Sequence, residues 1–77
     1  MHVHVRFFAS LRESLGRDEA RIDLPADARV ADAWAAATGQ TALPAGVLCA
    51  INHDYAAPTA AVQPGDEVAF FPPVTGG

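Results

Sequence analysis

The sequence ends with Asp66-Glu67-Val68-Ala69-Phe70-Phe71-Pro72-Pro73-Val74-Thr75-Gly76-Gly77, a stretch that predicts a strand running out of a domain. Its residues 67–71 alternate in the manner of a strand, with Val68 and Phe70 on one face and Ala69 and Phe71 on the other. The two prolines that follow cannot donate a hydrogen bond to a sheet, so the strand is expected to end before them.

The two final glycines indicate a function for this tail. Glycine has no Cβ, so its backbone can enter a slot that is too narrow for any other residue. The carboxylate of Gly77 would then be an acyl group on a thin, unhindered stalk, accessible to an enzyme that activates it. The alternative is a frayed chain end, since termini are often disordered.

Three segments carry a resemblance to a known family. Residues 65–77 resemble the C-terminus of the small, sulfur-carrying subunit of molybdopterin synthase, the MoaD family, which has a ubiquitin-like β-grasp fold. Residues 5–13, Val5-Arg6-Phe7-Phe8-Ala9-Ser10-Leu11-Arg12-Glu13, resemble the first strand and turn of that family, and Ala50-Ile51-Asn52 resembles its central strand. The sulfur carrier of the thiamine pathway shares the fold and the Gly-Gly end, but is less similar around the Phe-Phe-Pro-Pro segment.

The resemblance implies a carrier that other enzymes act upon. A ubiquitin-activating-like adenylyltransferase would use ATP to adenylate the Gly77 carboxylate, and sulfur would replace AMP to leave a C-terminal thiocarboxylate. No bound cofactor and no metal are expected. The tail would insert into the catalytic large subunit of molybdopterin synthase, in a heterotetramer of two large and two small subunits, through Pro73, Val74, Thr75, Gly76 and Gly77. Two carriers in turn would supply the sulfur of the molybdopterin dithiolene from a cyclic pyranopterin precursor.

The composition bounds the class of protein. The chain has 77 residues, enough for one small domain, and is 51% hydrophobic and 18% charged, as globular proteins are. A net charge of −4 argues against nucleic acid or an anionic membrane as partner. No apolar run approaches the length of a transmembrane helix. The single Cys permits no internal disulfide, so a reducing, cytoplasmic location is expected.

The rest of the sequence predicts three further strands, a short edge strand and one main helix. Residues 2–9 and 19–24 alternate as two strands of a hairpin, while residues 47–51 form a nearly continuous apolar run and residues 55–56 return as a short edge strand. Between the two hairpin strands, Ser10 is expected to cap a short turn. The apolar residues of the segment 30–38 recur at helical spacing, with Trp34 as the largest anchor and Asp27 as the nearest plausible N-cap.

This order predicts an α+β fold, a ubiquitin-like β-grasp with a mixed sheet of about five strands packed on one main helix. The first and last strands would lie side by side and parallel. We expect residues 1–71 to form the domain and residues 72–77 to form an extended, flexible tail.

The histidines and the single cysteine are weaker candidates for a functional site. His2 and His4 share one strand face, but without a third ligand a surface pair is favoured over a metal site, and His53 is expected in a turn. Cys49 could carry sulfur as a persulfide, although a Cys in an apolar strand usually behaves as a small buried hydrophobe. An iron–sulfur ferredoxin of this fold would need four Cys. No catalytic triad, phosphate loop or acid–base pair is visible.

Phe8 and Phe71 are the candidate partner interface. Alternation places both on the outer face of neighbouring strands, where a joint aromatic patch would suggest a protein-binding surface. The alternative is that loops or Pro72 cover them.

Two other functions remain open at this point. One is sulfur carriage for a different product, such as thiazole, and the other is a ubiquitin-like modifier of protein lysines. The chain has no Lys of its own, which prevents self-conjugation but not conjugation to other proteins.

Overall fold

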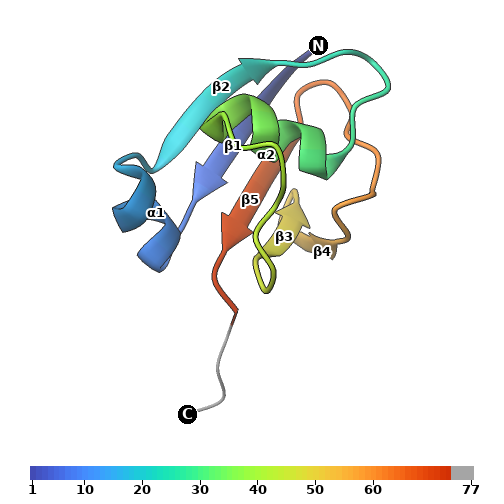
Figure 1. Ribbon diagram of the computed structural model, residues 1–77. Helices are drawn as coiled ribbons and strands as arrows, with labels where there is room; N and C mark the ends of the chain where they lie inside the picture. Colours follow the sequence, from blue (N-terminus) through green and yellow to red (C-terminus); the bar gives the residue numbers. More distant parts are fainter. Residues whose placement is uncertain (74–77) are drawn as a thin grey trace.

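In the computed structural model, which describes residues 1–73, five strands form one mixed sheet and the longer helix lies across one of its faces (Figure 1). The elements in chain order are β1 (His2–Phe7), α1 (Ala9–Leu15), β2 (Glu19–Asp23), α2 (Val30–Thr38), β3 (Leu48–Ile51), β4 (Asp54–Ala56) and β5 (Glu67–Phe71). The predicted α+β, β-grasp architecture is confirmed, with α1 as a second, short helix.

The sheet order is β2-β1-β5-β3-β4, so the first and last strands lie together in the middle. β1 and β5 are parallel, with Val5 opposite Val68 and Phe7 opposite Phe70, while the other neighbouring pairs are antiparallel. β5 is therefore hydrogen-bonded on both edges, by β1 and by β3. The strand that leads into the tail is the central strand of the sheet.

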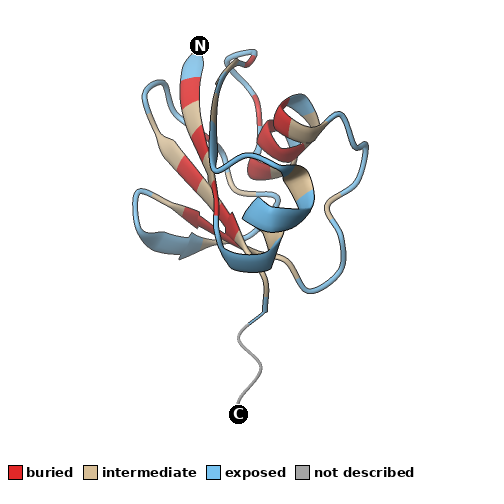
Figure 2. Cartoon of the chain, turned by 90° about the vertical axis from the view of Figure 1, so that its left-hand side faces the viewer, coloured by how far each residue is buried: buried red, intermediate tan, exposed pale blue. Residues whose placement is uncertain are grey.

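The core lies between the sheet and α2, where Figure 2 shows the buried positions gathered on the central strands and on one side of the helix. Trp34 is 1% exposed, and its indole meets the rings of Phe7 and Phe70 edge-on, with ring centroids 6.0 and 5.1 Å away. The apolar spacing of the helix therefore buries Trp34 as predicted. Such aromatic contacts add about 0.5–1.5 kcal/mol each beyond the burial of area.

Two predicted helix caps are wrong. α1 begins at Ala9, with Phe8 in the N-cap position, so Ser10 lies within the first turn and caps nothing. The cause is that Ala9 adopts a left-handed φ of 53°, which turns the chain directly from β1 into the helix. Asp27 does not cap α2, because Arg29 forms an isolated bridge with Ala61 and holds the chain extended up to the helix.

The observed cap of α2 uses Arg29 and Asp32. Arg29 is the N-cap residue, and its backbone N–H donates to the Asp32 carboxylate at 2.7 Å. A carboxylate in the first turn also interacts favourably with the helix dipole. At the other end Gly39 adopts φ 77° and its N–H donates to the carbonyl of Ala35 at 2.9 Å.

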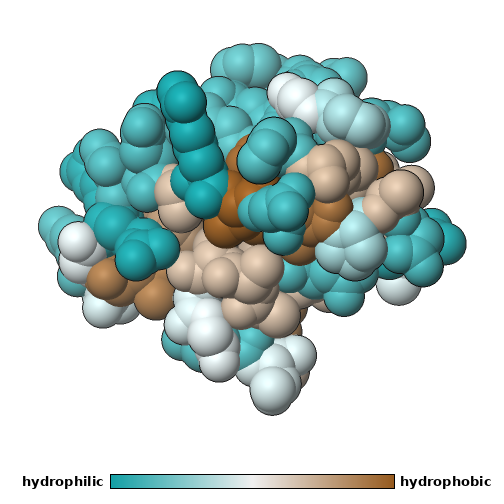
Figure 3. Space-filling view, turned by 90° about the horizontal axis from the view of Figure 1, so that it is seen from above, coloured by the Kyte–Doolittle hydropathy of each residue, from teal (hydrophilic) through white to brown (hydrophobic). Residues whose placement is uncertain are grey.

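The end of the molecule that carries the N-terminus is mainly hydrophilic, with a small apolar area in its centre (Figure 3). A folded protein usually keeps some apolar surface of this kind. Within residues 1–73, no helix has both the length and the apolar character that crossing a bilayer requires.

Candidate functional site

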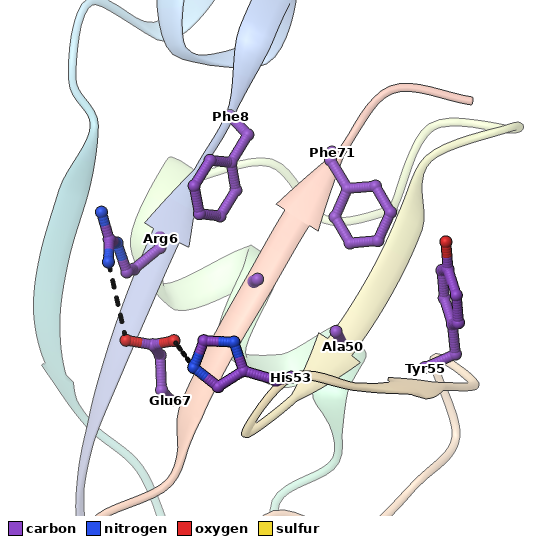
Figure 4. Close-up of a pocket in the computed structure, with 8 residues that line it drawn as sticks. Arg6, Phe8, Ala50, His53, Tyr55, Glu67 and Phe71 are labelled. Atoms are coloured by element: carbon purple, nitrogen blue, oxygen red, sulfur yellow. Dashed lines mark ion pairs between the residues drawn. The ribbon is translucent and has the colours of Figure 1, made fainter. Parts of the chain in front are cut away.

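The outer face of the sheet, which α2 leaves uncovered, contains a shallow pocket of about 280 Å³ (Figure 4). Its floor is apolar and aromatic, and charged groups stand at one end. We call it the outer-face pocket; its lining consists of Arg6, Phe8, Ala50, His53, Tyr55, Glu67, Ala69 and Phe71.

The strand register brings the two predicted interface residues together. Phe7 pairs with Phe70 on the inner side, and the N–H of Phe8 donates to the carbonyl of Phe70 at 3.1 Å. The next residue along each segment, Phe8 just after β1 and Phe71 at the end of β5, therefore lies on the outer face, and Figure 4 shows both rings over the pocket. Phe8 is the more exposed of the two, with 39% of its surface accessible, and Phe71 is half-buried.

Tyr55 was not among the predicted site residues, although it is the most exposed large apolar side chain of the described segment, at 76%. Its ring lies 5.8 Å from that of Phe71, centroid to centroid, across β3. Cross-strand pairing aligns Tyr55 with Ala50 and Ala50 with Ala69, so two small residues lie between the aromatic rings. The alternating pattern of the short edge strand could have predicted that Tyr55 faces outward. Its place at this pocket depends on how β4 pairs with β3, and β3 with β5, which the sequence does not show.

A two-residue turn at Asn52 and His53 fixes the lower end of the pocket. Both residues have positive φ, 49° and 75°, as a tight turn that matches the sheet twist requires. The Asn52 side chain donates to Asp66 at 2.9 Å and accepts from the N–H of Glu67 at 2.9 Å. These bonds tie the β3–β4 turn to the start of β5 and place His53 beside Glu67.

Glu67 lies within reach of one arginine and two histidines at this end of the pocket. Its carboxylate lies 3.8 Å from Arg6 Nη1 and 3.6 Å from His53 Nε2, the two contacts drawn as dashed lines in Figure 4. His4 Nδ1 is 3.9 Å from the same carboxylate. The Arg6 guanidinium also lies 5.2 Å from the centre of the Phe8 ring, which joins the charged end to the aromatic floor.

His53 is the one of the other candidate residues that lines this pocket, whereas Cys49, His2 and His4 do not. Cys49 is 3% exposed and faces the core, and burial raises the pKa of its thiol, so its thiolate is disfavoured. His2 and His4 lie on the outer face, where both contact carboxylates rather than each other. Among residues 1–73, no three metal-ligating side chains converge on one point.

The predicted tail begins at the upper end of the outer-face pocket. β5 ends at Phe71, and Pro72 and Pro73 follow directly. Pro73 is the last residue that the structure describes, so the predicted tail residues Val74, Thr75, Gly76 and Gly77 lie outside the described part of the chain.

A family model described as the ThiS family matches residues 5–77 of this chain. The chain belongs to the ThiS family. The match covers the domain and continues through both final glycines.

Curated relatives of this ThiS-family chain include two molybdopterin synthase sulfur carrier subunits, from Haemophilus influenzae and from Escherichia coli. Each is 39% identical to this chain, over 97% of this chain and 99% of the relative. The resemblance to the MoaD family is therefore confirmed along nearly the whole sequence.

Solved structures of similar fold include archaeal proteins. The small archaeal modifier protein SAMP1 of Haloferax volcanii covers all of both chains, with a TM-score of 0.84 and 32% identity. A Pyrococcus furiosus protein described as a molybdopterin converting factor, subunit 1, has a TM-score of 0.78 and 30% identity, over 96% of this chain and 99% of that one.

Proposed function

We propose that this chain is a MoaD-type sulfur carrier that supplies sulfur for molybdopterin synthesis. The observation that carries the proposal is the 39% identity to two molybdopterin synthase sulfur carrier subunits across nearly their full length. The fold supports it, because the last strand leaves the sheet beside an exposed aromatic pocket and leads into the Gly-Gly tail.

In this proposal the outer-face pocket binds the large subunit of molybdopterin synthase, in a heterotetramer of two large and two small subunits. The aromatic floor would supply most of the affinity, because buried aromatic anchors dominate protein interfaces. The ion pair between Arg6 and Glu67 is partly exposed and longer than a hydrogen bond, and such a pair contributes only about 0–1 kcal/mol. The charged end would instead select the orientation of the partner.

The tail, residues 72–77, would carry the reacting group. A bare carboxylate is a poor electrophile, so an ATP-dependent adenylyltransferase of the ubiquitin-activating kind first converts the Gly77 carboxylate to an acyl-adenylate. A sulfur nucleophile then attacks the acyl carbon and AMP leaves, which produces the thiocarboxylate. No cofactor bound to this chain takes part, and the single free Cys49 favours a reducing, cytoplasmic setting for these steps.

Intact-mass measurement tests this chemistry. The chain ending at Gly77 is incubated with the activating enzyme, ATP and a sulfur source, and the expected product is heavier by one oxygen-to-sulfur exchange. Fragmentation should locate the added sulfur at Gly77, and omission of ATP should prevent it. A chain that gains no sulfur under these conditions would overturn the proposal.

A protein modifier is the second candidate, because the similarity to SAMP1, named a small archaeal modifier protein, covers the whole chain. A carrier for thiazole synthesis is a third, since the matching family model is that of ThiS. Capture of partners by the intact chain separates the three: a molybdopterin synthase large subunit, higher-mass lysine conjugates, or a thiazole synthase. The full-length curated relatives favour the first.

A further inference from the structure

The connector between α2 and β3 runs beside the point where the tail begins (Figure 1). β3 starts at Leu48, directly opposite Phe71 at the end of β5, so the residues just before Leu48 flank those just after Phe71. The N–H of Val47 donates to the carbonyl of Pro44 at 3.3 Å, which closes these residues into a turn. The turn 44–47 is thus held at the root of the tail.

At Gly46 this turn comes close to the tail. A Cβ built on Gly46 would lie 3.6 Å from Cγ and 3.9 Å from Cδ of Pro73, which is ordinary contact. A methyl group would therefore just touch the proline ring, and a longer side chain directed the same way would crowd it. No similar neighbour exists at three other described glycines with positive φ, Gly16, Gly39 and Gly65.

We propose that Gly46 is a positioning residue: its lack of a side chain leaves room for the Pro73 ring beside the turn 44–47, and this sets the direction in which the tail leaves the domain. This inference rests on the proposed function. It assigns to the turn 44–47 a role in sulfur transfer that is separate from docking, because the turn contributes no residue to the outer-face pocket.

The length of the tail makes its starting direction important. Four residues follow Pro73, and an extended chain spans at most about 3.3–3.6 Å per residue, so a fully extended tail would carry the acyl carbon at most about 14 Å beyond Pro73. A rotation of about 10° at Pro73 would move that end by about 2 Å. Misplacement of a reacting group by about 1 Å can lower a rate by about 100-fold.

The test compares substitutions that strain the backbone equally but differ in their contact with the tail. Gly46 has φ 87° and Gly65 has φ 83°, so a leucine is similarly strained at either position, yet only at Gly46 would it reach Pro73. Thiocarboxylated Gly46→Leu, Gly65→Leu and the unchanged chain are each mixed with the large subunit. Single-turnover sulfur transfer and the Kd for the large subunit are measured.

We expect Gly46→Leu to lower the single-turnover rate by at least about tenfold while leaving Kd unchanged, and Gly65→Leu to leave both unchanged. Gly46→Ala, which only touches the ring, should transfer faster than Gly46→Leu. If Gly46→Leu does not fold, Pro73→Ala instead removes the ring that lies beside Gly46, with Pro72→Ala as its control for lost chain stiffness. Pro73→Ala should then transfer more slowly than Pro72→Ala.

Equal rates for Gly46→Leu and Gly65→Leu, or for Pro73→Ala and Pro72→Ala, would overturn the positioning role alone. Absence of transfer by the unchanged chain would instead overturn the proposed function. A nuclear Overhauser cross-peak between the Gly46 Hα and the Pro73 ring protons checks their proximity without any partner. The cross-peak should be present in the unchanged chain and in Gly65→Leu. Its absence from the unchanged chain would overturn the inference.

Discussion

Tyr55 and Phe71 pack against each other across β3, with their ring centroids 5.8 Å apart on the outer face of the sheet. Each ring supports the other over the small side chain of Ala50, so the outer-face pocket is a formed surface before any partner arrives. Pre-organised aromatic residues of this kind lose little entropy on binding.

The first prediction concerns docking. Phe71→Ala should weaken binding to the large subunit by about 2 kcal/mol or more, as loss of an interface hot spot does. Tyr55→Ala should also weaken it, and the double variant should lose less than the sum because the two rings are in contact. Calorimetry measures all three, with Asp27→Ala, an exposed residue outside the pocket, as the control. Unchanged affinity of Phe71→Ala would remove the pocket from the interface.

A second prediction separates the tail from the docking surface. Deletion of Gly77 shortens the tail by about 3.3 Å and puts the acyl carbon beyond the roughly 3–3.5 Å at which reacting groups must lie. We expect sulfur transfer to be abolished while most of the affinity for the large subunit remains. The product assay is paired with calorimetry on the same preparation, and full turnover by the shortened chain would contradict the assignment.

For the core, Trp34→Ala should lower the free energy of unfolding by about 3–5 kcal/mol, because a fully buried aromatic residue leaves a large cavity. Trp34→Phe should lower it less. The smaller ring can keep contact with Phe7 and Phe70, and within the described residues the indole N–H has no hydrogen-bond partner to lose. Urea denaturation followed by circular dichroism measures both, and an unchanged midpoint for Trp34→Ala would show that the indole is not an anchor.

Cys49 provides a test of where sulfur is carried. Burial raises the pKa of its thiol, so at neutral pH the reactive thiolate is scarce in the folded protein. Alkylation by iodoacetamide should be slow in buffer and fast in urea. Cys49→Ala should still gain one sulfur at Gly77 and transfer it; sulfur gained by the original chain but not by Cys49→Ala would indicate a persulfide carrier instead.

The contact between the N-terminal ammonium and Asp23 should make the free energy of unfolding depend on pH in the acid range. The Met1 ammonium donates to Asp23 at 3.0 Å and lowers the pKa of that carboxyl below its usual value of about 4. A carboxyl with a lowered folded pKa stabilises the protein above its unfolded pKa, and this contribution is lost as the pH falls through the folded pKa. Asp23→Asn should therefore show a shallower loss of stability below about pH 4.

Asp23 is exposed, so the effect should be small, and it is measured as the urea midpoint against pH. Acetylation of the Met1 amine should flatten the same part of the profile, because it removes the ammonium. A steeper acid limb in either case would contradict the assigned sign.

Much of the fold could be predicted because alternation and helical spacing report burial directly. Residues 67–71 and 30–38 form the strand and the helix that their patterns predicted. The helix caps were less predictable, since the start of α2 depends on the bridge between Arg29 and Ala61, a contact between distant segments. A prediction that searches only the neighbouring residues for a Ser or Asp cap cannot detect this contact.

The candidate site was predictable in part for a related reason. Phe8 and Phe71 follow from alternation in two strands that the family resemblance made neighbours. Tyr55 and His53 come from the opposite edge of the sheet, and their arrival beside Phe71 and Glu67 depends on the register of β3 and β4. The contact of Gly46 with Pro73 likewise depends on the path of a connector, which carries no periodic signal.

The central place of β5 has a mechanical consequence. A partner that grips the tail and pulls along it would load the hydrogen bonds to β1 and to β3 together, in shear, rather than peel an edge strand one bond at a time. The parallel pairing of β1 with β5 means that this load passes straight into the first strand of the chain. Such a domain should withstand repeated insertion and withdrawal of its tail without local unfolding, as a reusable carrier must.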